Sequence, residues 1–371
     1  MSTQHTIANS LDLKRSFASI RILALLGLAL AACRNDSPTA PSSGIEPSIV
    51  QATYSVKALA IPAGALLGEG SDINDAGVVA GWYKVNNTWS AARWISPTQR
   101  QNLGTLPGFQ SSLAKGINSA GTIVGYVVTS SFNASRAFVW TSAGGMKALQ
   151  GLGGSGAIAF AINDNGVIVG EASDQNDQIH AVKWNAAGVI TDINPVGGAG
   201  QATAINNAGD IAGFNFPQGG NGEHAWLWRA NGTQQDLGTL GGQRAFGYGI
   251  NSGVTVVGWS NQTPPKPDIA FRWSQATGMK PITSFGGGSQ ALGISDKNRV
   301  VGFQVINAGV VGLTTLKGVK TVLPDLAPQK GFPFSGPTSV NTCGNITGSS
   351  VSPNPTNGNS VPVIWTKTGC D

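Results

Sequence analysis

The stretch INDAGVVAG, residues 73–81, decides the fold because it recurs along the chain. It consists of an Ile/Val-Asn pair, a turn and a short apolar run that ends in Gly. Clear copies begin at Ile117, Ile162, Ile205 and Ile250, and weaker copies begin at Ile294 and Val340. Successive copies lie 43 to 46 residues apart. Seven copies at this spacing match the period of four-stranded propeller blades.

Each repeat contains four candidate strands. Small residues precede the Ile-Asn pair, as in 112–117, and the Asn-x-x-Gly that follows supplies turn residues that tolerate positive φ. A second strand such as 122–126 and a third such as 136–140 come next, and a fourth runs into a Gly-rich link. No segment shows a period of 3.6 residues, so we expect almost no helix. The sequence predicts an all-β, seven-bladed propeller of four-stranded blades.

The chain ends before its last blade is complete. The seventh repeat reaches VIW at 363–365, which is third-strand material, and lacks a fourth strand. Residues 54–59 (YSVKAL) lie directly before the first repeat and resemble GMKAL at 145–149. We therefore expect residues 54–59 to supply the outer strand of the last blade, so that the N-terminal strand closes the ring.

The composition agrees with this architecture. Of 371 residues 52 are Gly, twice the usual share of about 7%, and charged residues make up 11% against a typical ~25%. The 10 Trp and 13 Phe exclude a disordered chain, which would be depleted in aromatic residues. A coiled coil is excluded because it would need about half its residues from Ala, Glu, Lys, Leu and Arg. Collagen is excluded because Gly does not recur at every third position of this sequence.

The N-terminus has the pattern of a targeting segment. Lys14, Arg15 and Arg21 precede the apolar run 22–30, which is too short to span a bilayer as a helix. The run leads into LAAC, ending at Cys33, which resembles a bacterial lipobox, whose Cys is lipidated and becomes the first residue of the mature protein. We expect residues 1–32 to be a lipoprotein signal peptide. A secretory signal with an incidental Cys is the alternative.

We expect the mature chain to be located in the cell envelope. Arg34 follows Cys33, so the Asp that signals inner-membrane retention in enteric bacteria is absent, and by analogy we expect an outer-membrane lipoprotein. Residues 33–50 are rich in Ser and Pro and predict a tether, and residues 51–371 form the propeller. No other apolar stretch reaches transmembrane length.

Net charge bears on nucleic-acid binding, and the cysteine count bears on disulfide formation. The net charge of +5 falls to +3 once residues 1–32, with three basic side chains and one acidic, are removed. No basic cluster indicates nucleic-acid binding. Cys343 and Cys370 remain after Cys33, and an extracytoplasmic compartment permits disulfides, so we expect these two to pair. A pair of free thiols is the alternative.

The repeats resemble the HAF family of extracellular bacterial repeats, named for a His-Ala-Phe signature. The signature reads HAV at 180–182, HAW at 224–226 and RAF at 136–138, and the link LGTL occurs at 103–106 and 237–240. The resemblance covers about residues 60–365. The sixth repeat departs from it with VGLTT at 311–315, and the seventh is also degenerate. The family is defined by its repeat and has no agreed reaction, so the resemblance implies no activity.

Residues with catalytic or metal-binding chemistry are few. His180 and His224 occupy the same repeat position, which favours a scaffold role over a catalytic or metal-binding one. The repeated Asn residues are expected to satisfy their own turns rather than a ligand. The loop 174–177 comes nearest to a calcium site but lacks the Gly and the distal Glu. We expect no catalytic residue, no metal and no cofactor.

The fifth position of the third strand is Trp in six repeats. A sugar-stacking role is conceivable, but recurrence at one strand position favours packing between blades. The positions are Trp94, Trp140, Trp184, Trp228, Trp273 and Trp365.

The loops between the second and third strands differ in every repeat and are rich in Asn, Gln, Ser and Gly. In an up-and-down blade they share a face with the links between blades, and we expect a binding site there. The candidate residues are Trp89, the Asn of the loop 127–135 (Asn133, next to Phe132), Asn176, Asn215 and Trp259. The favoured function is a monomeric, non-enzymatic binding lipoprotein with a protein or polysaccharide partner. The alternative is a glycan-active hydrolase or lyase with its site over the central channel.

Overall fold

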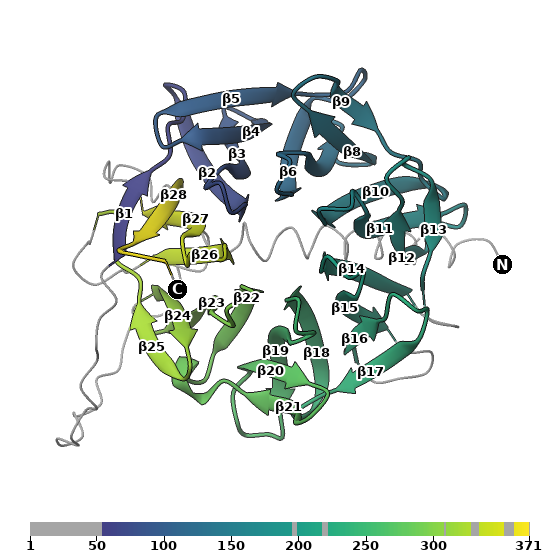
Figure 1. Cartoon of the computed structure of the whole chain (residues 1–371). Helices are drawn as coiled ribbons and strands as arrows, with labels where there is room; N and C mark the ends of the chain where they lie inside the picture. Colours follow the sequence, from purple (N-terminus) through teal and green to yellow (C-terminus); the bar gives the residue numbers. More distant parts are fainter. Residues whose placement is uncertain are drawn as a thin grey trace.

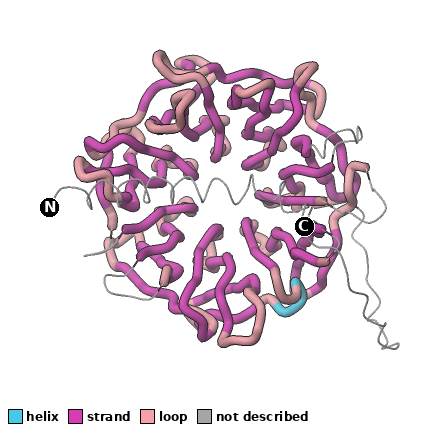
Figure 2. The backbone as a smooth tube through the Cα atoms, turned by 180° about the vertical axis from the view of Figure 1, so that it is seen from behind, coloured by secondary structure: helices cyan, strands magenta, loops and turns pink. Residues whose placement is uncertain are grey.

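Seven antiparallel sheets surround a central axis in the computed structural model (Figure 1). The structure describes residues 54–194, 199–216, 222–307, 309–327, 334–351 and 360–370. Within these ranges each sheet has four strands, and the one helix is the 3₁₀ turn η2, Thr283–Phe285 (Figure 2). The all-β, seven-bladed fold predicted from the repeat is confirmed. None of the described segments is a helix long and apolar enough to cross a membrane.

The strands follow the repeat in chain order, innermost first. Blade 1 is β2 (Ala65–Ile73), β3 (Val79–Val85), β4 (Thr88–Ser96) and β5 (Gln99–Gly104); blade 2 is β6 (Ser111–Ile117), β7 (Ile123–Val128), β8 (Ser135–Thr141) and β9 (Gly145–Ala148); blade 3 is β10 (Gly153–Ile162), β11 (Ile168–Asp174), β12 (Ile179–Trp184) and β13 (Ile190–Asp192); blade 4 is β14 (Ala199–Ile205), β15 (Ile211–Phe216), β16 (His224–Trp228) and β17 (Gln234–Gly238).

The remaining blades complete the ring. Blade 5 is β18 (Gly241–Ile250), β19 (Val256–Gln262), β20 (Ile269–Ser274) and β21 (Gly278–Pro281); blade 6 is β22 (Ser289–Ile294), β23 (Val300–Ile306), β24 (Gly309–Leu316) and β25 (Val319–Val322); blade 7 is β26 (Ser335–Val340), β27 (Ile346–Val351), β28 (Ser360–Lys367) and β1 (Tyr54–Ala58).

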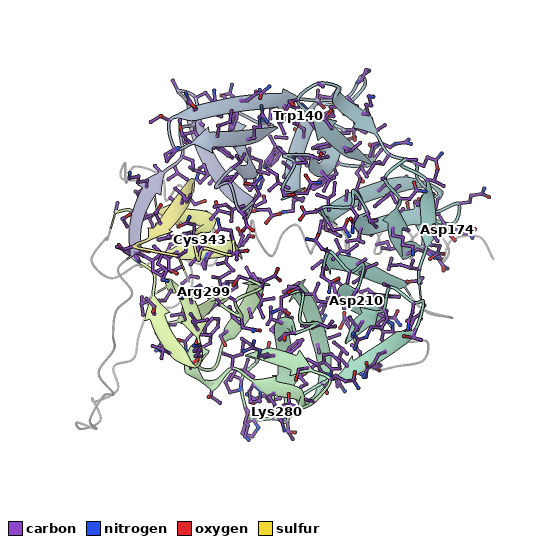
Figure 3. The ribbon with its side chains drawn as sticks, in the orientation of Figure 1. Trp140, Asp174, Asp210, Lys280, Arg299 and Cys343 are labelled. Atoms are coloured by element: carbon purple, nitrogen blue, oxygen red, sulfur yellow. A yellow bond between two sulfur atoms is a disulfide. The ribbon has the colours of Figure 1, made fainter. Side chains whose placement is uncertain are left out.

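The N-terminal strand closes the ring, as the sequence predicts. β1 pairs antiparallel with β28, with Tyr54 opposite Lys367 and Ala58 opposite Val363. The Tyr54 hydroxyl donates a hydrogen bond to the Gly344 carbonyl oxygen at 3.0 Å. The chain therefore joins its two ends in one sheet. A disulfide joins Cys343, labelled on blade 7 in Figure 3, to Cys370 near the C-terminus.

The repeated Asn residues hold neighbouring blades together. Each side-chain oxygen accepts a hydrogen bond from the backbone four residues on, as Asn163 Oδ1 does from Val167 N at 2.9 Å. Each side-chain amide then donates to the backbone carbonyl of the next blade, as Asn163 Nδ2 does to Asn206 O at 3.1 Å. The same donation runs from Asn74, Asn118, Asn206, Asn251 and Asn341. The expected turn-satisfying role is present, and a link between blades is added to it.

The repeated Gly at the end of the apolar run is a requirement of close packing. Opposite it, each innermost strand carries a one-residue bulge, such as the one between Ala159 and Ala161 in β10. A Cβ placed on Gly170 would lie 1.9 Å from the carbonyl oxygen of Ile158. The same contact recurs at 1.8 to 2.1 Å at Gly81, Gly125, Gly213, Gly258, Gly302 and Gly348.

The large side chains pack between blades. One cluster joins Leu103 and Leu106 of blade 1 to Phe138 and Trp140 of blade 2. The six repeated Trp residues are all buried, with exposed fractions of 0 to 4%. The indole N–H of Trp184 donates to the Gln150 carbonyl in the preceding link at 2.8 Å, and three other Trp make the equivalent bond. Their role is therefore the expected packing role.

Candidate functional site

One face of the ring carries both the links between blades and the loops between second and third strands. We call it the loop face, and the opposite face, with the Asn turns, the turn face. Isolated bridges join a link to the end of the second strand, where the loop begins: Leu152 pairs with Asp174, and Leu240 pairs with Gln262. The adjacency expected from an up-and-down blade is present, so the variable loops form one continuous surface with the links.

One predicted residue, Trp89, meets an aromatic ring from the neighbouring blade on this face. Trp89 at the start of β4 and Phe132 in the β7–β8 loop come from neighbouring blades, and their rings pack edge to face with centroids 5.2 Å apart. The Lys84 ammonium lies 4.4 Å from the Trp89 ring centroid. Phe132 remains 37% exposed. Trp89 therefore acts as a support, and Phe132 presents its ring to solvent.

Phe132 is held in an unusual backbone conformation. Its φ is +57°, a region that side chains other than Gly adopt rarely and at a cost of about 1–3 kcal/mol. A hydrogen bond from Phe132 N to Thr129 O at 3.0 Å closes the turn that imposes it. An exposed aromatic ring is thus fixed at the tip of a strained turn, where its entropy loss on binding is small.

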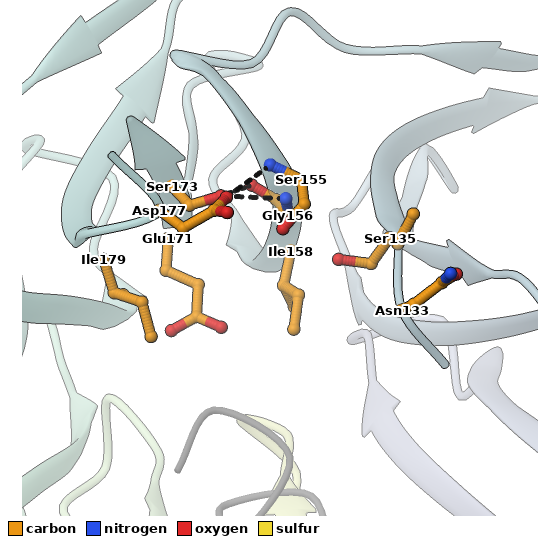
Figure 4. Close-up of a pocket in the computed structure, with 10 residues that line it drawn as sticks. Asn133, Ser135, Ser155, Gly156, Ile158, Glu171, Ser173, Asp177 and Ile179 are labelled. Atoms are coloured by element: carbon orange, nitrogen blue, oxygen red, sulfur yellow. Dashed lines mark hydrogen bonds between the residues drawn. The ribbon is translucent and has the colours of Figure 1, made fainter. Parts of the chain in front are cut away.

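A small, open pocket lies beside this turn, between blades 2 and 3 (Figure 4). Blade 2 contributes the start of β8 and the residues before it, and blade 3 contributes β10, β11, the β11–β12 loop and the start of β12. The lining residues are Asn133, Ala134, Ser135, Ser155, Gly156, Ile158, Glu171, Ser173, Asp177 and Ile179. Asn133 follows Phe132 directly, so pocket and exposed ring are contiguous.

Hydrogen bonds fix the rim of the pocket. Asp177 Oδ1 accepts from Ser155 N at 2.8 Å, and Ser173 Oγ accepts from Gly156 N at 2.8 Å, as Figure 4 shows. Ser135 Oγ, on blade 2, accepts at 3.2 Å from a backbone N–H of β10 on blade 3. The rim polar groups are therefore largely committed to the scaffold, and the pocket is preformed.

Glu171 provides the charge of the pocket. It lies on β11, is 3% exposed, and points its carboxylate into the open space below the rim in Figure 4. Ile158 and Ile179 extend in the same direction beside it. Gln201 Nε2 of blade 4 donates a hydrogen bond to Glu171 Oε2. The Glu171 carboxylate therefore lies between two aliphatic side chains on the lining of the pocket.

A second buried carboxylate lies two blades away. Glu69 Oε1 accepts from the Trp82 indole at 3.3 Å and lies 3.8 Å from the Lys115 ammonium. Burial raises the pKa of the Tyr126 phenol above its ordinary value, and the charges of Glu69 and Glu171 raise it further. Tyr126, 2% exposed, is thus a neutral phenol between two acidic side chains.

Sequence reasoning missed Glu171, although a signal for it exists. The residue after the repeated Gly is aromatic in five repeats, as Trp82, Tyr126, Phe214, Trp259 and Phe303. The third repeat alone has a carboxylate there. A charged side chain at a position where other blades bury an aromatic ring departs from the packing rule of the scaffold.

The remaining predicted loop residues do not gather at this pocket. Asn176 is exposed in the β11–β12 loop, where its N–H donates to Asp174 Oδ1 at 2.8 Å. Asn215 is 4% exposed within β15, and its side-chain oxygen has no partner among the described residues. Trp259 is 9% exposed within β19, stacked on Phe246 at 4.7 Å. Placing Asn215 and Trp259 on exposed loops was wrong, because β15 and β19 extend beyond the apolar run.

The two histidines have matching surroundings in neighbouring blades. His180 Nδ1 lies 2.8 Å from Asp192 Oδ2, and His224 Nδ1 lies 2.7 Å from Asp236 Oδ2. In each case the partner is on the outermost strand of the same blade, so the pair fastens the third strand to the fourth. The repetition of the pair agrees with a scaffold role.

The calcium alternative at 174–177 has no support in the geometry. Asp174 Oδ1 accepts from the backbone of Asn176 and Gln178, and Asp177 Oδ1 accepts from Ser155. These oxygens are directed at their own loop and link. Across the described ranges no cluster of three His, Cys, Asp or Glu side chains could hold a metal ion.

Comparison with known proteins identifies the architecture and leaves the family open. No protein-family model matches the chain, and no curated protein matches it. Among solved structures, the β-propeller domain of the Trilobed protease from Pyrococcus furiosus is similar, with a TM-score of 0.56 and 10% identity over 84% of this chain and 96% of that one. The BP39L lectin from Burkholderia pseudomallei is also similar, with a TM-score of 0.51 and 11% identity over 87% of this chain and 98% of the lectin.

Other similar structures are longer than the propeller. Puromycin hydrolase matches with a TM-score of 0.51 and 10% identity over 84% of this chain, which spans 54% of that enzyme. TolB from Acinetobacter baumannii matches with a TM-score of 0.45 and 13% identity over 67% of this chain, which spans 64% of TolB. At these identities the likeness to the three structures with TM-scores above 0.5 establishes the propeller fold alone.

Proposed function

We propose that this protein is a non-enzymatic binding lipoprotein of the cell envelope that engages a protein partner through the loop face at blades 1 to 3. One observation carries the proposal: Phe132 is exposed, strained and fixed at the edge of a preformed pocket. Strained backbone at an exposed aromatic residue is typical of binding sites rather than of scaffold. The other blades supply the rigid ring on which the loops are held.

A protein partner is favoured over a polysaccharide by what surrounds the aromatic pair. Sugar rings stack on open aromatic faces, but the Lys84 ammonium lies over Trp89, and Phe132 packs against the same ring. Of the two residues Phe132 is the exposed one, and it lies next to the pocket that Ile158 and Ile179 help to line. This pattern suits an apolar side chain beside a second anchoring side chain.

The test compares two exposed apolar residues on opposite faces. Phe132 is on the loop face, and Ile95, 52% exposed near the end of β4, is on the turn face. The mature wild-type protein, Phe132→Ala and Ile95→Ala are used as baits in pull-downs from envelope extracts and as probes on a glycan array. We expect capture of a protein that Phe132→Ala loses and Ile95→Ala keeps. Equal capture by all three would refute the site, and retention on glycans would transfer the proposal to a polysaccharide.

The lipid anchor and the family are parts of the same proposal. Residues 1–53, which include Cys33, lie outside the described residues, so their support is the LAAC pattern and the apolar run before it. Membership of the HAF family rests on the signature at 180–182 and 224–226 and on the repeat phrase. Metabolic labelling with palmitate tests the anchor: the wild type should incorporate label, and Cys33→Ala should not. A labelled Cys33→Ala protein would refute it.

A glycan-active hydrolase or lyase is the second candidate, favoured by the buried carboxylates near Tyr126. Each is already engaged, since Glu69 accepts from Trp82 and Glu171 accepts from Gln201. The raised pKa of Tyr126 makes the phenol a poor base at neutral pH. A reducing-end assay over a polysaccharide panel tests this candidate. Cleavage that Glu69→Gln abolishes would establish it in place of the binding function.

A further inference from the structure

We propose that the turn face of blades 6 and 7 docks on an anionic lipid surface. The contact surface consists of Lys297, Lys317, Lys320 and Lys367 with Val319, and we call it the lysine patch. The inference rests on the proposed function for one point, the lipid anchor that brings this face to a membrane. The charge and the exposure of the patch are independent of that anchor. The loop face, with the proposed partner site, points away from the membrane in this arrangement.

Blade 6 supplies three of the four lysines. Lys297 lies in the turn between β22 and β23, Lys317 lies in the turn between β24 and β25, and Lys320 follows within β25. Lys297 and Lys317 are exposed, and Lys320 is half-buried. None of these three forms an ion pair within the described part of the chain. Lys367, at the end of β28, adds a fourth from blade 7. These side chains are distant in sequence and gather in the folded ring.

The basic excess is particular to this part of the turn face. In the turns of blade 6, Asp296 is outnumbered by Lys297, Arg299 and Lys317, and no other blade has more basic than acidic residues in its described turns. Asp296 Oδ1 accepts from Ser252 N of blade 5 at 2.8 Å, so this carboxylate is held against the neighbouring blade. The lysines therefore dominate the charge that an approaching surface meets.

The loop face has the opposite charge. Its described loops and links carry four acidic side chains and one basic side chain: Asp177, Glu223, Asp268, Asp325 and Lys266. An anionic surface is attracted to the lysines on one face and repelled by the carboxylates on the other. The distribution of charge therefore orients the ring with its turn face toward anionic lipid.

An exposed valine stands among the lysines. The fourth strand begins with Gly145 in blade 2 and Gly278 in blade 5, but with Val319 in blade 6, where the side chain is 53% exposed. It follows the tight turn of Lys317, whose φ of +50° is uncommon for a residue other than Gly. An aliphatic side chain between lysines is suited to a membrane interface, because the valine enters the headgroup region while the ammonium groups stay at the phosphates.

The path of the chain brings the anchor to the same face. The hydroxyl of Tyr54, the first described residue, donates to the Gly344 carbonyl oxygen in a turn of blade 7, so β1 begins at the turn face. β1 lies beside β25 on the rim in Figure 1. The 20 residues 34–53 separate Tyr54 from Cys33 and can span at most about 70 Å. A lipid on Cys33 therefore holds the patch near the membrane, where a weak contact is sufficient.

Vesicle binding tests the patch without an anchor. The mature chain carrying Cys33→Ala is mixed with vesicles of phosphatidylcholine and phosphatidylglycerol in equal amounts, or of phosphatidylcholine alone. The bound fraction is measured by cosedimentation. We expect binding to the anionic vesicles to be at least about tenfold tighter than binding to the neutral ones, and to weaken as salt is added.

A matched pair of triple variants locates the charge. Lys297→Gln/Lys317→Gln/Lys320→Gln should bind anionic vesicles at least about tenfold more weakly, because each lysine at an anionic surface contributes a several-fold factor. The control removes the same charge at three exposed lysines of blades 2, 3 and 5, which lie beyond the screening distance, and should stay within about twofold of the starting protein. Its substitutions are Lys147→Gln, Lys183→Gln and Lys280→Gln.

A matched pair of valine variants tests the aliphatic contact. Val319→Ala should weaken vesicle binding several-fold, because methyl groups that leave water on docking are lost. Val322 is 46% exposed at the loop-face end of the same strand, so Val322→Ala should leave binding unchanged. Equal effects of the two substitutions would refute the insertion of Val319.

Three results would overturn the inference. They are equal binding to anionic and neutral vesicles, equal losses in the two lysine triples, and tighter binding to double-stranded DNA than to anionic vesicles. The third result would assign the patch to a different polyanion. The first and third comparisons need no substitution in the patch, so they hold even if a lysine variant alters the fold.

The inference and the proposed function fail separately. Anionic vesicle binding in a protein that incorporates no palmitate would leave the lysine patch and refute the anchor. Palmitate incorporation at Cys33 without a preference for anionic vesicles would leave the anchor and refute the patch. Phe132→Ala, on the loop face, should bind vesicles as the starting protein does, whatever its effect on partner capture.

Discussion

Replacement of Asn163 measures how strongly the ring of Asn side chains couples neighbouring blades. Asn163→Ala removes two hydrogen bonds at once, from Val167 N to Oδ1 and from Nδ2 to Asn206 O. The Val167 N–H then loses its side-chain acceptor, which costs about 1–3 kcal/mol. Asn206 O keeps a donor, Gly209 N at 3.1 Å, so its loss is limited to about 1 kcal/mol. We expect the free energy of unfolding to fall by about 2–4 kcal/mol.

The chain contains its own control for this experiment. The sixth repeat has Ser295 where other repeats have Asn, and Ser295 Oγ accepts from Arg299 N at 3.2 Å. A serine therefore keeps the bond within the turn and lacks the amide that reaches the next blade. Asn163→Ser should lose about 1 kcal/mol, the donation to Asn206 alone.

Urea titration followed by tryptophan fluorescence distinguishes the two contributions. At an unchanged dependence on urea, the transition midpoints should fall in the order wild type, Asn163→Ser, Asn163→Ala. A loss below about 1 kcal/mol for Asn163→Ala would refute the accounting, because it would mean that water replaces both bonds. Equal losses for Ser and Ala would show that the inter-blade donation carries the whole effect and the turn acceptor carries none.

Four other perturbations follow from the same structure. Gly170→Ala places a Cβ against a backbone carbonyl oxygen and should reduce the free energy of unfolding by about 3 kcal/mol or more, which urea titration would detect; a neutral result would refute the close approach. Thr315→Val removes a buried hydroxyl that has no partner among the described residues and should raise the free energy of unfolding by about 1 kcal/mol; a loss would show that the hydroxyl is satisfied. Deletion of residues 51–60 removes β1 and should abolish the cooperative thermal transition seen by circular dichroism; a stable monomer would refute ring closure. The hydrogen bond from the Ser119 N–H lowers the pKa of the Asp164 carboxyl in the folded protein. The ionised carboxylate therefore stabilises the fold fully above its ordinary pKa near 4, and this stabilisation is lost as the pH falls through the lower folded value. Asp164→Asn should flatten this part of the dependence of stability on pH, and an unchanged dependence would contradict the role of Asp164.

The fold could be predicted because its determinants are repeated. A residue such as Trp184 or Gly170 performs the same task in each blade, so the spacing of its copies reveals the period and the period reveals the architecture. Ring closure could be predicted for a related reason, since the missing fourth strand left one blade incomplete and 54–59 had the matching pattern. The acceptors of the Asn side chains could not be predicted, because Asn206 O becomes the partner of Asn163 only when adjacent blades are docked.

The site was harder to predict because burial in a propeller does not follow sequence variability. Asn215 and Trp259 were assigned to variable loops, yet the second strands of blades 4 and 5 continue through them, and the ladder with the third strand holds both inside. Phe132 lies in a loop that does leave the ladder, and there the turn projects its ring. Strand length is set by pairing with the neighbouring strand, which composition alone does not report.

One buried position departs from the packing rule that the repeat otherwise follows. Five of the six positions equivalent to Glu171 in the other blades are aromatic, and in the two neighbouring blades the rings of Tyr126 and Phe214 are 2 and 3% exposed. A phenylalanine at 171 would obey the scaffold rule and bury more apolar surface, which is stabilising. A buried carboxylate instead costs desolvation and needs the Gln201 amide to orient it. The third blade therefore departs from the packing rule at this position, where it buries a hydrogen-bonded carboxylate in place of an aromatic ring.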